Sequence, residues 1–97
     1  MNARIVIGQT QIDKKDEAVV IYRDSIVSAA KEQNGYKNAF LLTDSETGKF
    51  ISITLWETEA DMTAGEASGY YQEQIAKLGA LFASPPTLEH YEVSVQA

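Results

Sequence analysis

Two side chains in this sequence of 97 residues are candidates for chemistry, and each is the only one of its type: Trp56 and His90. Histidine ordinarily gains or loses a proton near neutral pH, so His90 is a candidate general base. An indole ring can stack on a flat ligand and donate its N–H to a developing oxyanion, so Trp56 is a candidate catalytic donor. Both residues also have ordinary interpretations, because Trp56 could pack at the core of a dimer and a lone histidine is commonly structural.

Five further side chains could line the pocket of a small substrate. Three of them alternate along one predicted strand and share a face with Trp56, which ends that strand. A methionine that follows is a flexible filler suited to an apolar pocket, and a tyrosine that starts the last predicted helix is free to line the pocket mouth. The adjacent Tyr71 falls on the apolar stripe of that helix and is predicted to be core. The five candidate substrate-binding residues are Phe50, Ser52, Thr54, Met62 and Tyr70.

Composition excludes several other kinds of site. The sequence has no cysteine, which rules out disulfides, thiolate nucleophiles and cysteine-based zinc sites, and its single histidine gives no signal for a metal site. It contains no phosphate loop or dinucleotide fingerprint, so we expect no cofactor. A net charge of −6 with scattered basic residues argues against a nucleic-acid partner. Because no apolar run is long enough to span a membrane and no signal peptide is recognisable, we expect a cytoplasmic protein.

The elements that position these residues can be predicted from periodicity and turn signals. Apolar residues at helical spacing indicate a first helix, capped by Asp13. A short polar connection ending in Gly48 indicates an antiparallel hairpin, and Thr58 opens a capping box. Gly69 interrupts the helix that follows, and Pro85-Pro86 ends the next one. In chain order we expect a strand at 4–12, a helix at 14–33, strands at 36–43 and 49–56, a short helix at 58–67, a second helical segment after Gly69 and a strand at 87–95.

This order predicts one ferredoxin-like α+β domain over residues 1–97, an antiparallel βαββαβ sheet with both helices on one face. The other face of the sheet is then uncovered. The third strand shows Phe50 and Trp56 on one side, and a face left to water does not normally carry both. We therefore expect this side to be the uncovered one, shared by His90 if Tyr91 packs on the helices. A second copy of the chain would cover it, giving a homodimer with a cavity between the two sheets.

The hairpin and the start of the next helix carry a family resemblance. The segment from Leu41 to Asp61 reads LLTDSETGKFISITLWETEAD, in which a strand ends in Trp-Glu and an acidic residue soon opens a helix. The later Tyr91-Glu92-Val93 fits the same pattern. These features resemble the antibiotic biosynthesis monooxygenase domain family. The resemblance covers essentially the whole chain in element order and implies the dimeric α+β barrel fold.

The resemblance implies more than one kind of activity. Members of the family include cofactor-free quinone-forming oxygenases, haem-degrading enzymes and a processing enzyme for a small signalling sugar. The oxygenases typically carry an Asn four residues before the strand-ending Trp and a Tyr six residues after it, positions held here by Ser52 and Met62. The haem-degrading members need a histidine on the last long helix and a second tryptophan. This sequence has neither, so haem chemistry is not expected.

We therefore predict a cofactor-independent, monooxygenase-like protein that acts on a small hydroxylated aromatic or quinol-type molecule in the cavity between the sheets. His90 would be the base and Trp56 the oxyanion donor, in a space that excludes water. The alternative is a non-catalytic dimeric module of the same fold that binds a small apolar molecule or is structural. An open cavity with polar groups would favour the enzyme, and a cavity filled by Phe50 and Trp56 would favour the alternative.

Overall fold

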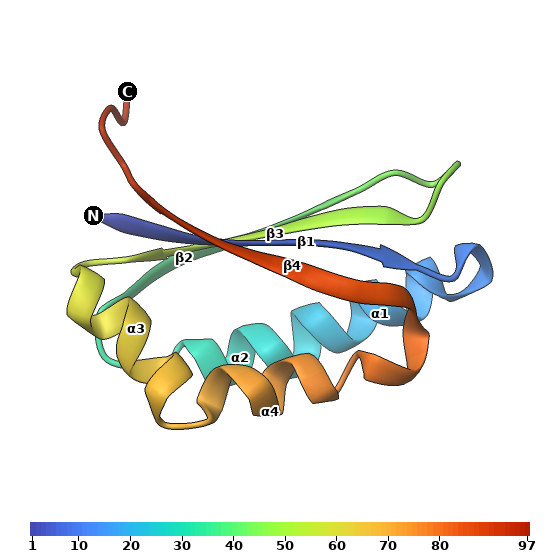
Figure 1. The fold of residues 1–97 in the computed structure, drawn as a ribbon, viewed down its shortest axis with the longest axis horizontal. Helices are drawn as coiled ribbons and strands as arrows, with labels where there is room; N and C mark the ends of the chain where they lie inside the picture. The colour runs from blue at the N-terminus through green and yellow to red at the C-terminus, as the bar shows by residue number, and fades with distance from the viewer.

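Four strands form one antiparallel sheet in the order β2-β3-β1-β4 (Figure 1). The computed structural model describes residues 1–97, and the strands are β1 (Asn2–Thr10), β2 (Tyr36–Thr43), β3 (Lys49–Trp56) and β4 (Phe82–Glu92). β2 and β3 form the predicted hairpin, in which Gly48 has a positive φ of 79°. A glycine adopts this conformation without the strain that a side chain would cause, which explains its place at the end of the polar connection.

All the helices lie on one face of this sheet (Figure 1). The first helical rod consists of α1 (Lys15–Ile21), a π-helical turn (Tyr22–Ile26) and α2 (Val27–Ala30). The second rod, on the same face of the sheet, consists of α3 (Glu59–Ala67) and α4 (Tyr70–Ala76). The order strand, helix, strand, strand, helix, strand confirms the predicted ferredoxin-like α+β fold. None of these helices has the length and apolar character needed to cross a lipid bilayer.

The ends of the helices confirm some of the predicted signals and correct others. The Thr58 hydroxyl accepts a hydrogen bond from the backbone N–H of Asp61 at 3.0 Å, as the capping box predicts. Asp13 is not the cap of the first helix, because it lies inside a 3-10 turn (Ile12–Lys14) and its side chain makes no cap hydrogen bond. Gly69, with a φ of 88°, separates α3 from α4 as expected.

The last strand begins earlier than predicted, at Phe82, and therefore contains Pro85 and Pro86. Two features let the sheet accept these prolines. β4 is an edge strand, so only one side of it needs to donate N–H groups. Its register with β1 also shifts between Ile7 and Gln9, next to the proline pair, so neither proline has to complete the regular ladder.

Phe50 and Trp56 lie on the helix-covered face of the sheet, and the expectation that they mark the uncovered face is wrong. Phe50 is 5% exposed and Trp56 is 1% exposed beneath the helices. The Tyr22 hydroxyl of the first helical rod lies 2.8 Å from Ser52 Oγ, and Ser52 shares a face of β3 with Phe50 and Trp56. This face of β3 therefore points toward the helices. His90 pairs with Arg4 across β4 and β1, so it shares the covered face with Trp56.

The uncovered face is nevertheless apolar, because β3 carries large apolar residues on both of its sides. The cross-strand pairs of this face join Ile5 to Ile53 and Ile7 to Ile51, and Phe40 and Leu42 of β2 flank them, each 50% exposed. Tyr91 belongs to this face and is 54% exposed, so it does not pack on the helices as expected. A covering partner is therefore still expected, but on the side of β3 that carries Ile51 and Ile53 rather than on the side of Phe50 and Trp56.

Candidate functional site

A mostly apolar cavity of about 50 Å³ lies between the sheet and the helices of a single chain. The expected cavity lay between two sheets, so its location is corrected. Phe50, Ser52 and Thr54 of β3 form part of the sheet-side wall, and Tyr70 of α4 contributes to the helix-side wall. The structure thus gathers four of the five predicted substrate-binding residues around one space. Their binding role stays a prediction.

Glycines let the aromatic side chains of the cavity pack closely. A Cβ atom at Gly8 of β1 would lie 2.4 Å from the Phe50 ring, so only glycine leaves room for this ring. Phe50 also stacks on Phe82, with ring centroids 5.5 Å apart. A Cβ atom at Gly65 of α3 would lie 3.0 Å from the Tyr70 ring and 3.4 Å from Nη2 of Arg4. Glycine at these two positions therefore allows Phe50 and Tyr70, which line the cavity, to pack directly against β1 and α3.

Arg4 is a buried cation in the cavity wall, with 4% of its surface exposed. Its guanidinium lies 5.2 Å from the ring centroids of both Trp56 and Tyr71, a distance typical of cation–π contacts. Nε donates a hydrogen bond to Glu66 Oε2 at 3.2 Å, and Nη2 donates one to the backbone carbonyl of Met62. A guanidinium has five N–H donors and stays charged, so these contacts fix its position and leave donors free for a ligand.

Trp56 packs its ring against the Arg4 guanidinium and does not line the cavity. Its indole N–H donates a hydrogen bond to Thr54 Oγ1 at 2.9 Å, and the Tyr36 ring packs against it edge-on. Met62, which is 1% exposed, is likewise absent from the cavity wall, unlike the other four predicted substrate-binding residues. Trp56 therefore does not border the cavity itself but contacts two residues that do, Arg4 and Thr54.

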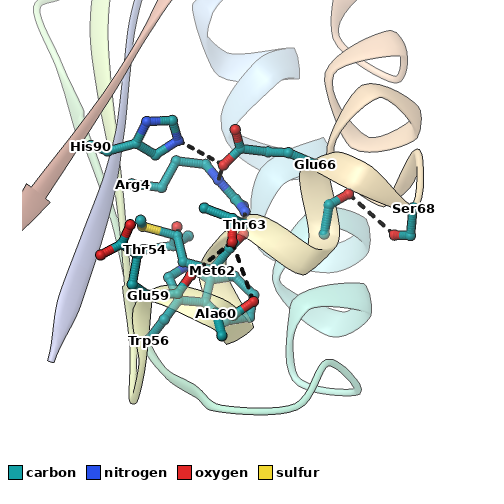
Figure 2. A network of polar contacts seen from close by, with 11 residues as sticks. Arg4, Thr54, Trp56, Glu59, Ala60, Met62, Thr63, Glu66, Ser68 and His90 are labelled. Atoms are coloured by element: carbon teal, nitrogen blue, oxygen red, sulfur yellow. Dashed lines mark hydrogen bonds and ion pairs between the residues drawn. The ribbon is translucent and has the colours of Figure 1, made fainter.

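His90 lies in a second depression, a polar surface groove of about 230 Å³ that also includes Glu59, Glu92 and one edge of Met62. Figure 2 shows His90 of β4 and Arg4 of β1 both pointing toward Glu66 on α3. His90 Nε2 lies 2.7 Å from Glu66 Oε2, the same oxygen that accepts the Arg4 hydrogen bond. The groove and the cavity are thus connected through one carboxylate. No cluster of three or more His, Asp or Glu side chains is placed to hold a metal ion.

The tyrosine hydroxyls around the cavity are held in their protonated form. Burial raises the pKa of Tyr70 to about 12 and also raises the pKa of Tyr71 and of Tyr22. The π-helical turn presents Tyr22 to the sheet, where its hydroxyl donates to the Phe40 carbonyl at 3.3 Å and so is available to accept from Ser52. π-Helical turns occur often at functional sites because they redirect a side chain within a helix.

Gln74 of α4 is the one buried side chain whose polar atom has no partner. It is 8% exposed, it lines the cavity, and its Oε1 accepts no hydrogen bond within the protein. Its neighbours on the same side are Tyr70 and Tyr71 of α4 and Leu78, which follows the end of α4, and all three line the cavity. A purely structural position with these neighbours would suit an apolar side chain.

Sequence reasoning missed three residues of this site: Arg4, Glu66 and Gln74. Each looks like an ordinary surface charge or polar residue in the sequence, since most Arg, Glu and Gln side chains are exposed. The useful signal was the alternation of side chains along β1, which places Arg4 on the same face of the strand as Val6 and Gly8. That signal identifies a buried arginine only once the pairing of β1 with β3 is known.

Comparison with solved structures identifies the fold. The chain matches a monooxygenase of Streptomyces coelicolor in complex with the ligand nanaomycin D with a TM-score of 0.81 and 12% identity, over 99% of this chain and 89% of that chain. A protein of Deinococcus radiodurans, named as a candidate antibiotic biosynthesis monooxygenase, matches with a TM-score of 0.79 and 16% identity, over 100% and 96% of the two chains. A similarly named protein of Nitrosomonas europaea matches with a TM-score of 0.77 and 17% identity, over 98% and 100%. No family model matches the sequence, and no curated protein is detectably similar to it in sequence.

Proposed function

We propose, from the premise that this chain has the fold of the antibiotic biosynthesis monooxygenases, that it is a cofactor-independent monooxygenase for a small hydroxylated aromatic molecule. The substrate would bind in the cavity between the sheet and the helices. The observation that carries this proposal is Arg4, a buried guanidinium held by Glu66 and two aromatic rings at the wall of an apolar space. The Streptomyces neighbour, a monooxygenase solved with a ligand, supports the assignment of the reaction class.

The chemistry requires a substrate that supplies its own electrons. A phenol gives up its O–H proton to solvent water as it binds, and the resulting anion is electron-rich enough to react with dioxygen at a ring carbon. A carbon–oxygen bond forms to give a peroxide anion, which takes one proton back from water and becomes a hydroperoxide. Loss of the proton from that carbon then breaks the O–O bond, so one oxygen atom stays in the quinone and the other leaves as water. The substrate is oxidised, dioxygen is reduced, and no other reductant is needed.

In this proposal Arg4 stabilises the phenolate. An opposite charge nearby favours the ionised form of a ligand, and the effect is strong where water is excluded. Trp56 would act through Arg4 by fixing the guanidinium, and Thr54 would receive the indole N–H. His90 would act through Glu66, because His90 Nε2 and Arg4 Nε contact the same carboxylate oxygen. Tyr70, protonated with a pKa of about 12, is a neutral donor beside the ring.

The test uses two readouts of one site. A bound 4-nitrophenol, whose phenolate absorbs visible light, should ionise at lower pH in the wild type than free in solution. Arg4→Met should abolish this shift and reduce oxygen uptake with phenols and naphthols by on the order of 10²–10³-fold. Arg4→Lys keeps the charge and should retain part of both effects. Arg23→Met is the matched control, since Arg23 is exposed and pairs with Asp24 at the surface.

A wild type that shifts the ionisation of nitrophenol but consumes no oxygen with any phenol would favour the second candidate function, a non-catalytic binding module. One observation supports that candidate. The cavity of about 50 Å³ is smaller than the ~150 Å³ void that admits benzene in an engineered protein core, so a ring enters only if side chains move. In both versions we propose that the chain works in the cytoplasm as a homodimer, with a second copy covering the open sheet face.

A further inference from the structure

We propose that Gln74 selects the ligand of the cavity by accepting a hydrogen bond from a ligand hydroxyl group. The inference rests on the proposed function only in that the cavity is a binding site, and it does not depend on oxidation. Gln74 Oε1 has no hydrogen-bond partner in the protein, although the side chain is 8% exposed and lines the cavity. A ligand that donates to this oxygen would satisfy it.

An unpaired buried acceptor weakens the folded state, because the atom has lost its water and gained nothing in return. The local sequence offers no packing reason for the glutamine. Ile75 of α4 and Leu78, which follows the end of α4, line the same wall with apolar side chains, whereas Gln72 and Glu73 are exposed. Gln74 is therefore a polar residue in an apolar position, which is the arrangement expected of a residue kept for a ligand.

Arg4 and Gln74 together define the class of ligand. Arg4 lies in the sheet-side wall and offers only donors, and Gln74 lies in the helix-side wall and offers the free acceptor. A ligand that satisfies both must carry an oxygen that accepts or ionises and a second group that donates. The geometry points to an aromatic ring with two hydroxyl groups, one held as the oxyanion at Arg4 and the other donating to Gln74.

The experiment compares diols with their mono-methyl ethers by calorimetry in the full-length protein. The pairs are catechol, resorcinol and hydroquinone against 2-, 3- and 4-methoxyphenol, which keep one hydroxyl and lose the second donor. We expect the wild type to bind at least one diol about tenfold more tightly than its ether, because a site built to bind a hydroxyl rejects an analogue without it. Gln74→Met should reduce this ratio to about one, and Gln74→Glu, which keeps an acceptor, should preserve the preference.

The melting temperature of the ligand-free protein is a second readout. A structural role of Gln74 would change it in the opposite direction from a ligand-binding role. Gln74→Met removes the unpaired acceptor, so the melting temperature without ligand should rise, whereas a glutamine that holds the helix in place would make it fall. Gln72→Met on the exposed side of α4 is the matched control and should change neither the ratio nor the melting temperature. An unchanged ratio in Gln74→Met, or a wild type that binds no diol better than its ether, overturns the proposal. Selective binding without oxygen uptake would leave it standing and would overturn only the proposed reaction.

Discussion

One oxygen of the Glu66 carboxylate accepts from Arg4 and also contacts His90, and this sharing makes Glu66 the residue on which the charge of the site depends (Figure 2). The Arg4 side chain is 5% exposed and the Glu66 side chain 20%, so the pair is mostly out of water. A buried cation that loses its partner is destabilising, because nothing else compensates the charge.

Glu66→Gln should therefore lower the free energy of unfolding by about 1–3 kcal/mol, measured by urea denaturation. Glu57→Gln is the matched control, since Glu57 pairs with Lys37 at 3.5 Å on the exposed surface. Exposed ion pairs contribute little, so the control should change stability by less than about 0.5 kcal/mol. Equal losses in the two variants would show that Glu66 does not compensate Arg4.

The uniqueness of Trp56 and His90 in the sequence singled out two residues that lie near Arg4, but it did not single out Arg4 itself. Both side chains lie close to Arg4, one beneath its guanidinium and the other across Glu66. Arg4 itself could not be predicted, because an arginine near the start of a strand is ordinarily solvated. Burial of such a residue depends on contacts with α3 that no local pattern encodes.

At the level of elements, several turn and cap signals predicted the right positions, although Asp13 does not cap the first helix and the last strand contains the two prolines. The faces of the strands were predicted poorly. Gly48, Thr58 and Gly69 have local geometric requirements, and the structure places each where its signal indicates. The face of β3 is different. It carries Ile51 and Ile53 on one side and Phe50 with Trp56 on the other, so alternation of apolar residues cannot decide which side meets the helices.

The apolar uncovered face of the sheet predicts self-association. Light scattering at micromolar concentration should give about twice the chain mass of 10.7 kDa. Phe40→Lys places a charge on this face, where Phe40 is 50% exposed, and should weaken association at least about tenfold. Val20→Lys is the control, because Val20 is 46% exposed on α1 at the other side of the molecule. A monomeric wild type, or equal weakening by the control, would contradict the prediction.

Considered as a whole molecule, the protein should lose stability in alkaline solution. All five tyrosines have a raised pKa: burial is the main cause for Tyr22, Tyr36, Tyr70 and Tyr71, and a hydrogen bond to Glu89 is the main cause for Tyr91. In the unfolded chain tyrosine ionises near ~10. Between that pH and the higher pKa of the folded state, the unfolded chain binds fewer protons, so the free energy of unfolding falls as pH rises.

The measurement is a series of urea denaturations from about pH 8 to about pH 12, followed by circular dichroism. The tyrosine contribution should be complete below about pH 10 and lost progressively above it. Tyr70→Phe should make the alkaline decline shallower, because the pKa of Tyr70 reaches about 12 and its hydroxyl then no longer titrates. The same slope in the variant and the wild type would contradict this assignment.

Helix α4 has a consequence for the timing of ligand binding. It is seven residues long, starts directly after Gly69 without a side-chain cap, and carries Tyr70, Tyr71 and Gln74 of the cavity. A helix this short has no stability of its own and depends on packing, so it belongs to the part of the molecule that opens most readily. A ring larger than the resting cavity would have to wait for such an opening. The observed association rate should then level off at high ligand concentration, at a ceiling set by the protein rather than by diffusion.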